Sequence, residues 1–280
     1  MKHITAITEM QEFCRSLRRE GKTIGFVPTM GFLHDGHLSL MRTARAENDV
    51  AVASIFVNPT QFGPNEDLDR YPRDAEGDAM KCAAAGVDVL FLPATAEMYA
   101  GAPAVFVTVE KLSEVLEGAI RPGHFRGVAT VVTKLFNIVQ PNRAYFGQKD
   151  YQQCAVIRRM AAGLNMGVDI RALPTMRESD GLAMSSRNVY LDPEQRRKAT
   201  CLYRALSAAA ELVRAGVHEP EKVRQKMRAV LLAEKGVEID YAEIVDPDTL
   251  VPLDRMQDRM VLLVATRVGS TRLIDNLLVL

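Results

Sequence analysis

The sequence predicts an α/β protein whose first and larger domain is built on a doubly wound parallel sheet. Short apolar runs alternate with helical patterns over the first 175 residues, whereas residues 176–280 show two helical patterns followed by three apolar runs. The 280 residues are 48% hydrophobic and 25% charged, which is ordinary for a globular chain with two unequal domains. We therefore expect a Rossmann-like domain over residues 1–175 and a smaller α+β domain over residues 176–280.

The alternation in the first domain assigns its elements in order. Strands are expected at residues 23–28, 50–57, 87–92, 143–146 and 168–173. The helical patterns between them cover residues 37–48, 74–85, 126–139 and 150–163. Such alternation implies right-handed crossovers and parallel strands. Ligands of these sheets bind beyond the carboxyl ends of the strands, so functional groups are expected in the loops after Pro28, Val57, Phe146 and Leu173.

The second domain begins with helices and ends with strands. Pro193 suits the first turn of a helix that the periodicity extends to about residue 215. A second helix is expected from Pro220 to about residue 235. Strands follow at residues 237–245, 260–267 and 271–279, which makes this part an α+β domain.

Charge argues against binding to nucleic acid. The chain has 35 Lys plus Arg and 35 Asp plus Glu, and residues 1–175 contain 19 of each sign. Neither domain therefore carries the basic excess with which a protein neutralises phosphates along DNA or RNA. The triplet Arg196-Arg197-Lys198 lies in a helical pattern and is interpreted as a solvated helix face.

Sequence features also predict a cytoplasmic protein without a membrane partner. No apolar run approaches the roughly 18 to 20 residues that span a bilayer. Residues 1–19 contain Glu9, Gln11 and Glu12, which interrupt any secretory signal pattern. The cysteines are widely spaced and form no C-x-x-C pair, so reduced and mostly buried thiols are expected at Cys14, Cys82, Cys154 and Cys201.

Two histidines follow the first predicted strand. His34 and His37 flank Asp35-Gly36 where a helix begins, and a spacing of three places them on one face. The unpaired N–H groups and the positive dipole end of a helix N-terminus favour an anion there. Two imidazoles that donate to one phosphate could stabilise charge at phosphorus during nucleotidyl transfer. A pair of structural histidines, or half of a zinc site that lacks a third ligand at companion spacing, is the alternative interpretation.

Three further loops carry polar groups at strand ends. The second strand leads into Asn58 and Gln61, whose carboxamides could bind a small polar acid without adding charge, although a turn is the alternative. The fourth strand leads into Gly147-Gln148-Lys149-Asp150, where the lysine could meet phosphate or ribose oxygens. After the fifth strand, Met184-Ser185-Ser186-Arg187 offers two hydroxyls and a guanidinium that match phosphate geometry, and an ordinary surface loop is again the alternative.

Taken together, these loops resemble the pantoate–β-alanine ligase family over essentially the whole chain. The two-histidine signature alone is shared with the wider HxGH nucleotidylyltransferase and class I aminoacyl-tRNA synthetase superfamily, whereas the full set is highly specific. The resemblance is carried by Pro28-Thr29-Met30-Gly31 with His34-Asp35-Gly36-His37, Phe56-Val57-Asn58-Pro59-Thr60-Gln61-Phe62, Tyr71-Pro72-Arg73-Asp74, Arg121-Pro122-Gly123-His124-Phe125-Arg126-Gly127-Val128, Lys149-Asp150 and Leu182-Ala183-Met184-Ser185-Ser186-Arg187-Asn188.

The resemblance implies a ligase that makes pantothenate, for coenzyme A biosynthesis, from pantoate, β-alanine and ATP. A pantoyl adenylate would form first with release of pyrophosphate, and β-alanine would then displace AMP. Mg²⁺ would arrive with ATP, with no metal site on the protein, and a cytoplasmic homodimer is expected.

The resemblance also implies roles for individual residues. His34, His37, Lys149 and Arg187 would be catalytic, with His37 the candidate proton donor. Pantoate would bind to Gln61, Gln153 and Asn58, and β-alanine to Gln61. ATP would bind to Met30, Gly31, Phe32, Leu33, His34, Asp35, Gly36, His37, Gly147, Gln148, Lys149, Asp150, Met176, Met184, Ser185, Ser186 and Arg187.

Two positions depart from the family pattern, which often has Asn in place of Phe32 and Glu in place of Gln148. Neither side chain is expected to perform chemistry, so the departures affect local turn contacts. Another adenylyl transferase of the superfamily would share the histidine pair but lack the stretches at residues 58–62 and 121–128. An RNA-binding relative of the synthetases is disfavoured by the balanced charge of both domains.

Overall fold

The computed structural model describes residues 1–64 and 66–280, and the chain divides into two compact units. The first contains Met1–Gln148 and Gln152–Pro174, and the second contains Lys149–Tyr151 and Thr175–Leu280. The sequence placed one boundary between residues 175 and 176. The short segment Lys149–Tyr151, which belongs to the second unit although its chain neighbours belong to the first, has no counterpart in that prediction.

A six-stranded parallel sheet forms the first unit, as the strand–helix alternation predicted. Its strand order is β1-β4-β3-β2-β5-β6. The strands are β1 (Lys2–Ile4), β2 (Ile24–Thr29), β3 (Val50–Ile55), β4 (Val89–Phe91), β5 (Arg143–Gly147) and β6 (Asp169–Leu173). The chain runs outward in one direction from β2 and in the other from β5, so the switch point lies between the adjacent strands β2 and β5. A crevice for ligands is expected beyond their carboxyl ends.

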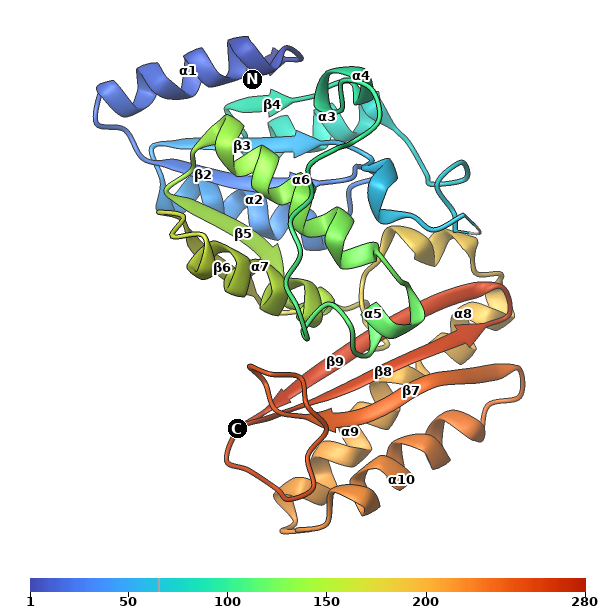
Figure 1. Ribbon diagram of the computed structural model, residues 1–280. Coiled ribbons are helices and arrows are strands. Elements are labelled where there is room, and N and C mark those ends of the chain that lie inside the picture. Colours follow the sequence, from blue (N-terminus) through green and yellow to red (C-terminus); the bar gives the residue numbers. More distant parts are fainter. Residues whose placement is uncertain (65) are drawn as a thin grey trace. The chain divides into compact units, whose positions relative to one another are not determined.

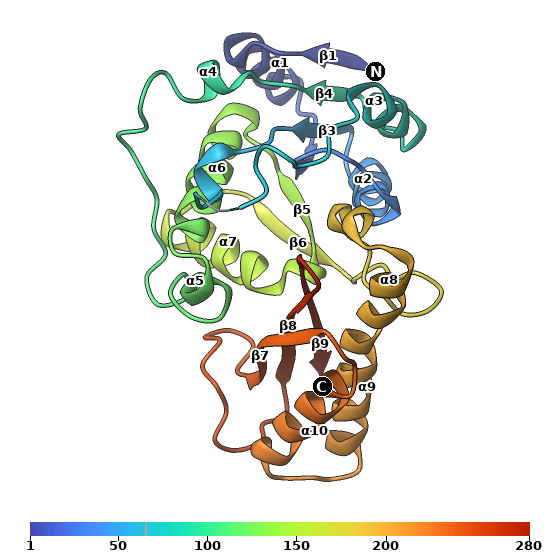
Figure 2. The same cartoon turned by 90° about the vertical axis from the view of Figure 1, so that its right-hand side faces the viewer.

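Helices cover both faces of this sheet. Figure 2 shows α2 and α3 on one side and α6 and α7 on the other, as right-handed crossovers require. The helices are α1 (Ile7–Arg19), α2 (Asp35–Glu47), α3 (Ala75–Ala84), α4 (Thr95–Met98), α5 (Glu117–Ile120), α6 (His124–Val139) and α7 (Tyr151–Gly163), with 3-10 turns η1 (Pro59–Gln61) and η2 (Gln148–Asp150). One core cluster packs α2 and α3 on the sheet through apolar side chains that include Leu40, Met41, Ala44, Ala53 and Leu90.

Two elements at the amino end of the first unit were missed by the periodicity. β1 has three residues, which is too short to give an alternating pattern. Its parallel pairing with β4 adds a sixth strand to the five predicted. α1 buries Met10, Cys14 and Leu17, whose spacing of four and three is helical, and the polar residues between them concealed that stripe.

The second unit contains an antiparallel sheet covered by two helices (Figure 1). Its strands β7 (Val237–Val245), β8 (Met260–Val268) and β9 (Thr271–Val279) agree with the predicted positions. Its helices are α8 (Pro193–Ala199), α9 (Cys201–Arg214) and α10 (Pro220–Leu232), and η3 (Ser186–Tyr190) precedes them. Apolar side chains from α9, α10 and all three strands form one core cluster.

The single helix predicted for residues 193–215 is wrong, because the structure breaks it at Thr200 into α8 and α9. The hydroxyl of Thr200 donates a hydrogen bond of 2.7 Å to the carbonyl of Arg197. Threonine side chains that bond to nearby carbonyls compete with the helical backbone pattern, which explains why the helix ends at this position.

All four cysteines are buried and, within the described residues, none is part of a disulfide, in agreement with their expected environment. Burial raises the pKa of the Cys14 thiol to about 12 and that of Cys82 to about 12 as well, so both remain protonated at neutral pH. Among the described residues, no helix combines the length and the apolar character needed to cross a membrane.

Candidate active site

The turn between β2 and α2 brings the two predicted histidines together. Helix α2 begins at Asp35, two residues earlier than predicted, so His34 is the residue that caps it and His37 lies in its first turn. The two imidazole rings lie 4.1 Å apart between centroids and are tilted by 41°. Both side chains are half-buried. The pair therefore lies at the positive end of a helix of 13 residues, as an anion-binding function requires.

Hydrogen bonding selects one tautomer of His37. The backbone N–H of His34 donates to Nδ1 of His37 over 3.3 Å. Because Nδ1 accepts, the hydrogen of the neutral ring is carried by Nε2. A neutral His37 can therefore act as a hydrogen-bond donor through Nε2, which is the property that stabilisation of a phosphate oxygen needs.

The carboxylate of Asp78 on α3 holds the backbone of this turn. It accepts hydrogen bonds from the N–H groups of Phe32, at 2.6 Å, and Leu33, at 2.7 Å, and it is almost completely buried. Lys81 donates to the carbonyl of Leu33 at 3.0 Å. Sequence reasoning missed Asp78. The sequence feature that could have identified it is its position one helical turn before the buried Cys82, which places a carboxylate on the core-facing side of α3.

Positive backbone angles shape the same turn. Gly31 has φ +85°, and an added Cβ would lie 3.0 Å from Asp78 Oδ2 and from Ile55 Cγ2. Phe32 has φ +50°, a region that asparagine adopts several-fold more often than most other residues. The Asn that the family often has here would suit this backbone. In this chain the N–H of Phe32 donates to Asp78, and the Lys81 ammonium lies 6.0 Å from the centroid of the Phe32 ring.

The loop after β3 presents Gln61 and fixes its carboxamide through Asn58. Asn58 Nδ2 donates to Gln61 Oε1 at 3.0 Å and to the carbonyl of Gly127 at 3.2 Å. Its Oδ1 accepts from Tyr99 and Thr60, and the side chain is 1% exposed. Gln61 Nε2 lies 3.2 Å from the sulfur of Met30, so the carboxamide sits against the residue that opens the histidine turn. Asn58 thus orients Gln61 through polar atoms that already have protein partners, and direct binding of pantoate by Asn58 stays a prediction.

Close packing against η1 explains why the stretch at residues 121–128 has a glycine at position 127. A Cβ at Gly127 would lie 2.4 Å from the Thr60 carbonyl oxygen and 2.6 Å from Gln61 Cα. Real Cβ atoms do not approach backbone that closely. Helix α6 can therefore pack on η1, and present the Gly127 carbonyl to Asn58, only because this position has no side chain.

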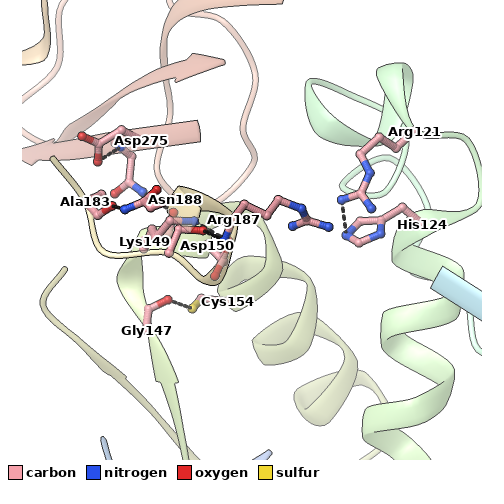
Figure 3. Close-up of polar contacts among 12 residues, drawn as sticks. Arg121, His124, Gly147, Lys149, Asp150, Cys154, Ala183, Arg187, Asn188 and Asp275 are labelled. Atoms are coloured by element: carbon pink, nitrogen blue, oxygen red, sulfur yellow. Dashed lines mark hydrogen bonds and ion pairs between the residues drawn. The ribbon is translucent and has the colours of Figure 1, made fainter. Parts of the chain in front are cut away.

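His124 holds the main chain of Gln61 in place, and Arg121 in turn holds His124. His124 Nδ1 lies 2.9 Å from the Gln61 carbonyl oxygen, which can only accept, so Nδ1 is the donor. Its Nε2 then accepts from Arg121 at 3.1 Å (Figure 3). Arg121 also binds Glu66 through both carboxylate oxygens, at 2.8 and 2.5 Å. Burial raises the pKa of Glu66, but the hydrogen bonds and charge of Arg121 outweigh burial and hold that pKa below its ordinary value.

Protonation of His124 should make the protein less stable in mild acid. Burial, followed by the charge of Arg121, lowers the pKa of His124 to about 4. An unfolded chain takes up this proton near pH 6.5, so between pH 6.5 and 4 the unfolded state binds more protons than the folded state. The free energy of unfolding should therefore fall as the pH falls through this window, by about 2 to 3 kcal/mol at pH 4.5 from this group.

Urea unfolding of wild type and His124→Gln at pH 6.5, 5.5 and 4.5 measures this effect. The variant should lose less stability than wild type over this range, whereas His218→Gln, at an exposed histidine, should match wild type. Parallel pH profiles for wild type and His124→Gln would contradict the assigned neutral state.

The loop after β5 passes from the first unit to the second. Gly147 ends β5, and its carbonyl accepts from the Cys154 thiol at 3.4 Å (Figure 3). Gln148 follows in the first unit, and Gln153 lies half-buried on the first turn of α7. Lys149 and Asp150 belong to the second unit, and their side chains lie 3.5 Å apart between Nζ and Oδ1.

A short hairpin in the second unit carries the predicted phosphate loop. Arg177 pairs with Ala183 in an antiparallel bridge, and Met184 N–H donates to the Met176 carbonyl at 3.0 Å. Ser185 caps η3 by accepting from the N–H of Arg187 at 3.3 Å. Asn188 Nδ2 donates to the Ala183 carbonyl at 3.1 Å, which ties the loop to the hairpin (Figure 3). Met176 is 42% exposed, a large apolar side chain that a bound ring could cover.

Geometry thus groups the predicted residues by unit. The first unit places Gln61 beside Met30, and Met30 opens the turn that contains both histidines. The second unit contains Lys149, Asp150, Met176 and residues 184–187. Within residues 1–64 and 66–280, no cluster of three or more His, Cys, Asp or Glu side chains is arranged to hold a metal ion. The individual binding roles remain predictions.

Known proteins resemble this chain over its whole length. The family model of pantoate-beta-alanine ligase matches residues 2–278. The pantothenate synthetase of Moorella thermoacetica is 56% identical over 276 residues, covering 99% of this chain and 98% of the relative. That of Acetivibrio thermocellus is 53% identical over 279 residues, covering 100% and 99%.

Solved structures agree with the observed fold. The crystal structure of pantothenate synthetase from Thermus thermophilus has a TM-score of 0.94 at 50% identity and covers 99% of each chain. A crystal structure of pantoate-beta-alanine ligase from Francisella tularensis, complexed with beta-gamma ATP and beta-alanine, has a TM-score of 0.80 at 35% identity. It covers 99% of this chain and 97% of the other.

Proposed function

Because the chain belongs to the pantoate–β-alanine ligase family, we propose that it condenses pantoate with β-alanine in an ATP-dependent reaction that yields pantothenate. The observation that supports this function best is the contact between Gln61 and Met30. It sets a carboxamide suited to a small acid directly against the turn that carries His34 and His37. A carboxylate substrate and the phosphates of ATP can then be held as neighbours.

The first step would form an acyl adenylate. A carboxylate oxygen of pantoate would attack the α-phosphorus, a new P–O bond would form, and the bond to the β-phosphate would break to release pyrophosphate. Pantoate is ionised at pH 7, so this step needs no general base. The remaining barrier is charge repulsion and positioning, which oriented donors and cations lower.

The side chains divide these tasks. His37 would donate through Nε2 to a phosphate oxygen, and His34 would support it from the same helix N-terminus. Gln61 and Gln153 would hold the carboxylate of pantoate. Lys149 and Arg187 would neutralise phosphate charge, with Arg187 on the outer phosphates, where a guanidinium suits the geometry.

In the second step the amine of β-alanine would attack the acyl carbon, and the C–O bond to AMP would break. The ammonium of β-alanine must first lose a proton. His124 is neutral at pH 7, but its Nδ1 donates to Gln61 and its Nε2 accepts from Arg121. We therefore assign His124 to positioning of the Gln61 main chain and not to proton removal.

We further propose that Mg²⁺ enters with ATP as part of the substrate, where it would neutralise phosphate charge. Mg²⁺ commonly keeps waters and substrate phosphates as ligands and is bound through few protein groups. A cytoplasmic homodimer is proposed from the family resemblance, and gel filtration with light scattering would measure the oligomeric state.

Exchange of labelled pyrophosphate into ATP tests the adenylate mechanism. Exchange is expected with pantoate and Mg²⁺ in the absence of β-alanine, because adenylation uses no group that β-alanine supplies. Gln61→Ala should slow the exchange by about tenfold or more through lost positioning. Gln225→Ala, at an exposed glutamine of α10, is the matched control and should leave exchange unchanged. Enzyme that is active in the complete reaction yet shows no pantoate-dependent exchange would overturn the acyl adenylate.

A further inference from the structure

Two consecutive polar side chains interrupt the apolar strand β9. Asp275 and Asn276 are only 3% and 2% exposed, and their neighbours Leu273 and Leu277 pack in or against the core of the second unit. Successive side chains of a strand point to opposite faces of the sheet. The pair can therefore reach two different structural elements from one place in the strand.

Asp275 fixes the hairpin that carries the phosphate loop. Its carboxylate accepts from both terminal nitrogens of Arg177, at 2.6 and 2.9 Å. Arg177 lies at one end of the hairpin and donates across it to the Gly181 carbonyl at 3.1 Å. Its guanidinium also stacks 4.0 Å from the centroid of the Tyr203 ring. The position of Asp275 thus determines where the hairpin that leads into Met184–Arg187 is held.

Asn276 fixes the main chain of the candidate lysine. Its Nδ2 donates to the Lys149 carbonyl at 2.7 Å, across 127 residues of sequence. A second bond, from the Tyr151 hydroxyl to the Pro247 carbonyl at 3.1 Å, holds the same short segment in the second unit. Neither bond involves the Lys149 side chain, so both set its backbone and leave its ammonium available for other contacts.

Stability alone does not account for this arrangement. Replacing a buried ion pair by apolar side chains of similar volume is often neutral or stabilising, so a buried carboxylate in an apolar strand is weak evidence of a structural function. Burial raises the pKa of Asp275 even though Arg177 opposes that effect, which indicates that the carboxylate is costly to keep there.

We propose that Asp275 and Asn276 are positioning residues for adenylation, with Asp275 placing the Met184–Arg187 loop and Asn276 placing Lys149. This inference rests on the proposed function, in which these groups neutralise the phosphates of ATP. It predicts a selective defect, because the two positioned groups would act while pyrophosphate is leaving. The second step starts after pyrophosphate has left and should depend on them much less.

Two half-reactions measured on the same samples test the proposal. Pantoate-dependent exchange of pyrophosphate into ATP reports adenylation, and AMP release from chemically prepared pantoyl adenylate with β-alanine reports the second step. Asp275→Asn and Asn276→Ala should each slow exchange by about tenfold or more and raise the KM for ATP, while AMP release changes less than about threefold. The ratio of the two rates does not depend on how much of a variant is folded.

Matched controls come from the same sheet. Asp240→Asn removes the charge of another aspartate that pairs with an arginine, Arg272, at 2.6 Å. Thr271→Val removes a buried hydroxyl from β9 itself. Both controls should keep the wild-type ratio. Variants of Asp275 and Asn276 that slow both half-reactions in proportion, or that match the controls, would overturn the inference, whereas a wild-type enzyme without exchange would contradict the proposed function itself.

Discussion

His37→Ala should lower the rate of pantoate-dependent pyrophosphate exchange by about 100- to 1,000-fold, because removing one oriented donor from a developing oxyanion costs roughly 3 to 4 kcal/mol. The structure supports a donor role, since His37 Nδ1 accepts the His34 N–H and leaves the ring hydrogen on Nε2. The variant loses the bond from the His34 N–H and the ring contact with His34, but His37 is half-buried and lies outside the apolar core, so the melting temperature should fall by no more than a few degrees.

Two further variants sharpen this prediction. His37→Gln can place an amide donor near the position of Nε2 and should keep more exchange activity than His37→Ala. His3→Ala, at an exposed histidine of β1, is the matched control and should behave as wild type. Turnover near wild type in His37→Ala would remove His37 from the catalytic residues, and a collapsed melting temperature would favour a structural histidine.

Lys149→Ala should lower the same exchange by about 100-fold or more through loss of a cation at the phosphates. The fold should be retained because Asn276 holds the Lys149 backbone carbonyl and not its side chain. The side chain's contact with Asp150 spans 3.5 Å, and exposed or partly exposed ion pairs of this kind contribute at most about 1 kcal/mol.

Turnover and thermal melting measured together separate the two possible roles of Lys149. Lys22→Ala removes a lysine that pairs with Glu20 on the surface at 2.8 Å, and it should change neither quantity. Unchanged exchange in Lys149→Ala would show that this lysine does not act on the phosphates, and a large loss of stability would indicate a role in holding the second unit together.

Local patterns predicted the elements of the fold better than their ends. The apolar runs at residues 143–146 and 271–279 correspond closely to β5 and β9. The start of α2 was placed at His37 and is observed at Asp35. That difference matters chemically, because it makes His34 the capping residue and places His37 inside the first turn. A helix end depends on which carbonyls and N–H groups find partners, and periodicity carries little information about that.

The candidate site was partly predictable for the same reason. The loops with His34, Gln61, Lys149 and Arg187 follow apolar runs, and the rule that ligands bind beyond the carboxyl ends of parallel strands singled them out. The sequence did not identify the side chains that hold these loop residues in place. Asp78 lies in a helical pattern, where its position on the core-facing side was the one signal, and Asn276 lies in the middle of an apolar strand.

The sequence by itself determined the α/β class, the parallel sheet, the separate α+β part and the family, because these follow from local periodicity and from motifs that can be read along the chain. Only the tertiary structure decided which side chains hold the site. The bonds from Asp78 to Phe32, from His124 to Gln61 and from Asn276 to Lys149 join residues 46, 63 and 127 positions apart. Such contacts form when separate elements pack together, and packing depends on the whole chain and not on the pattern within one element.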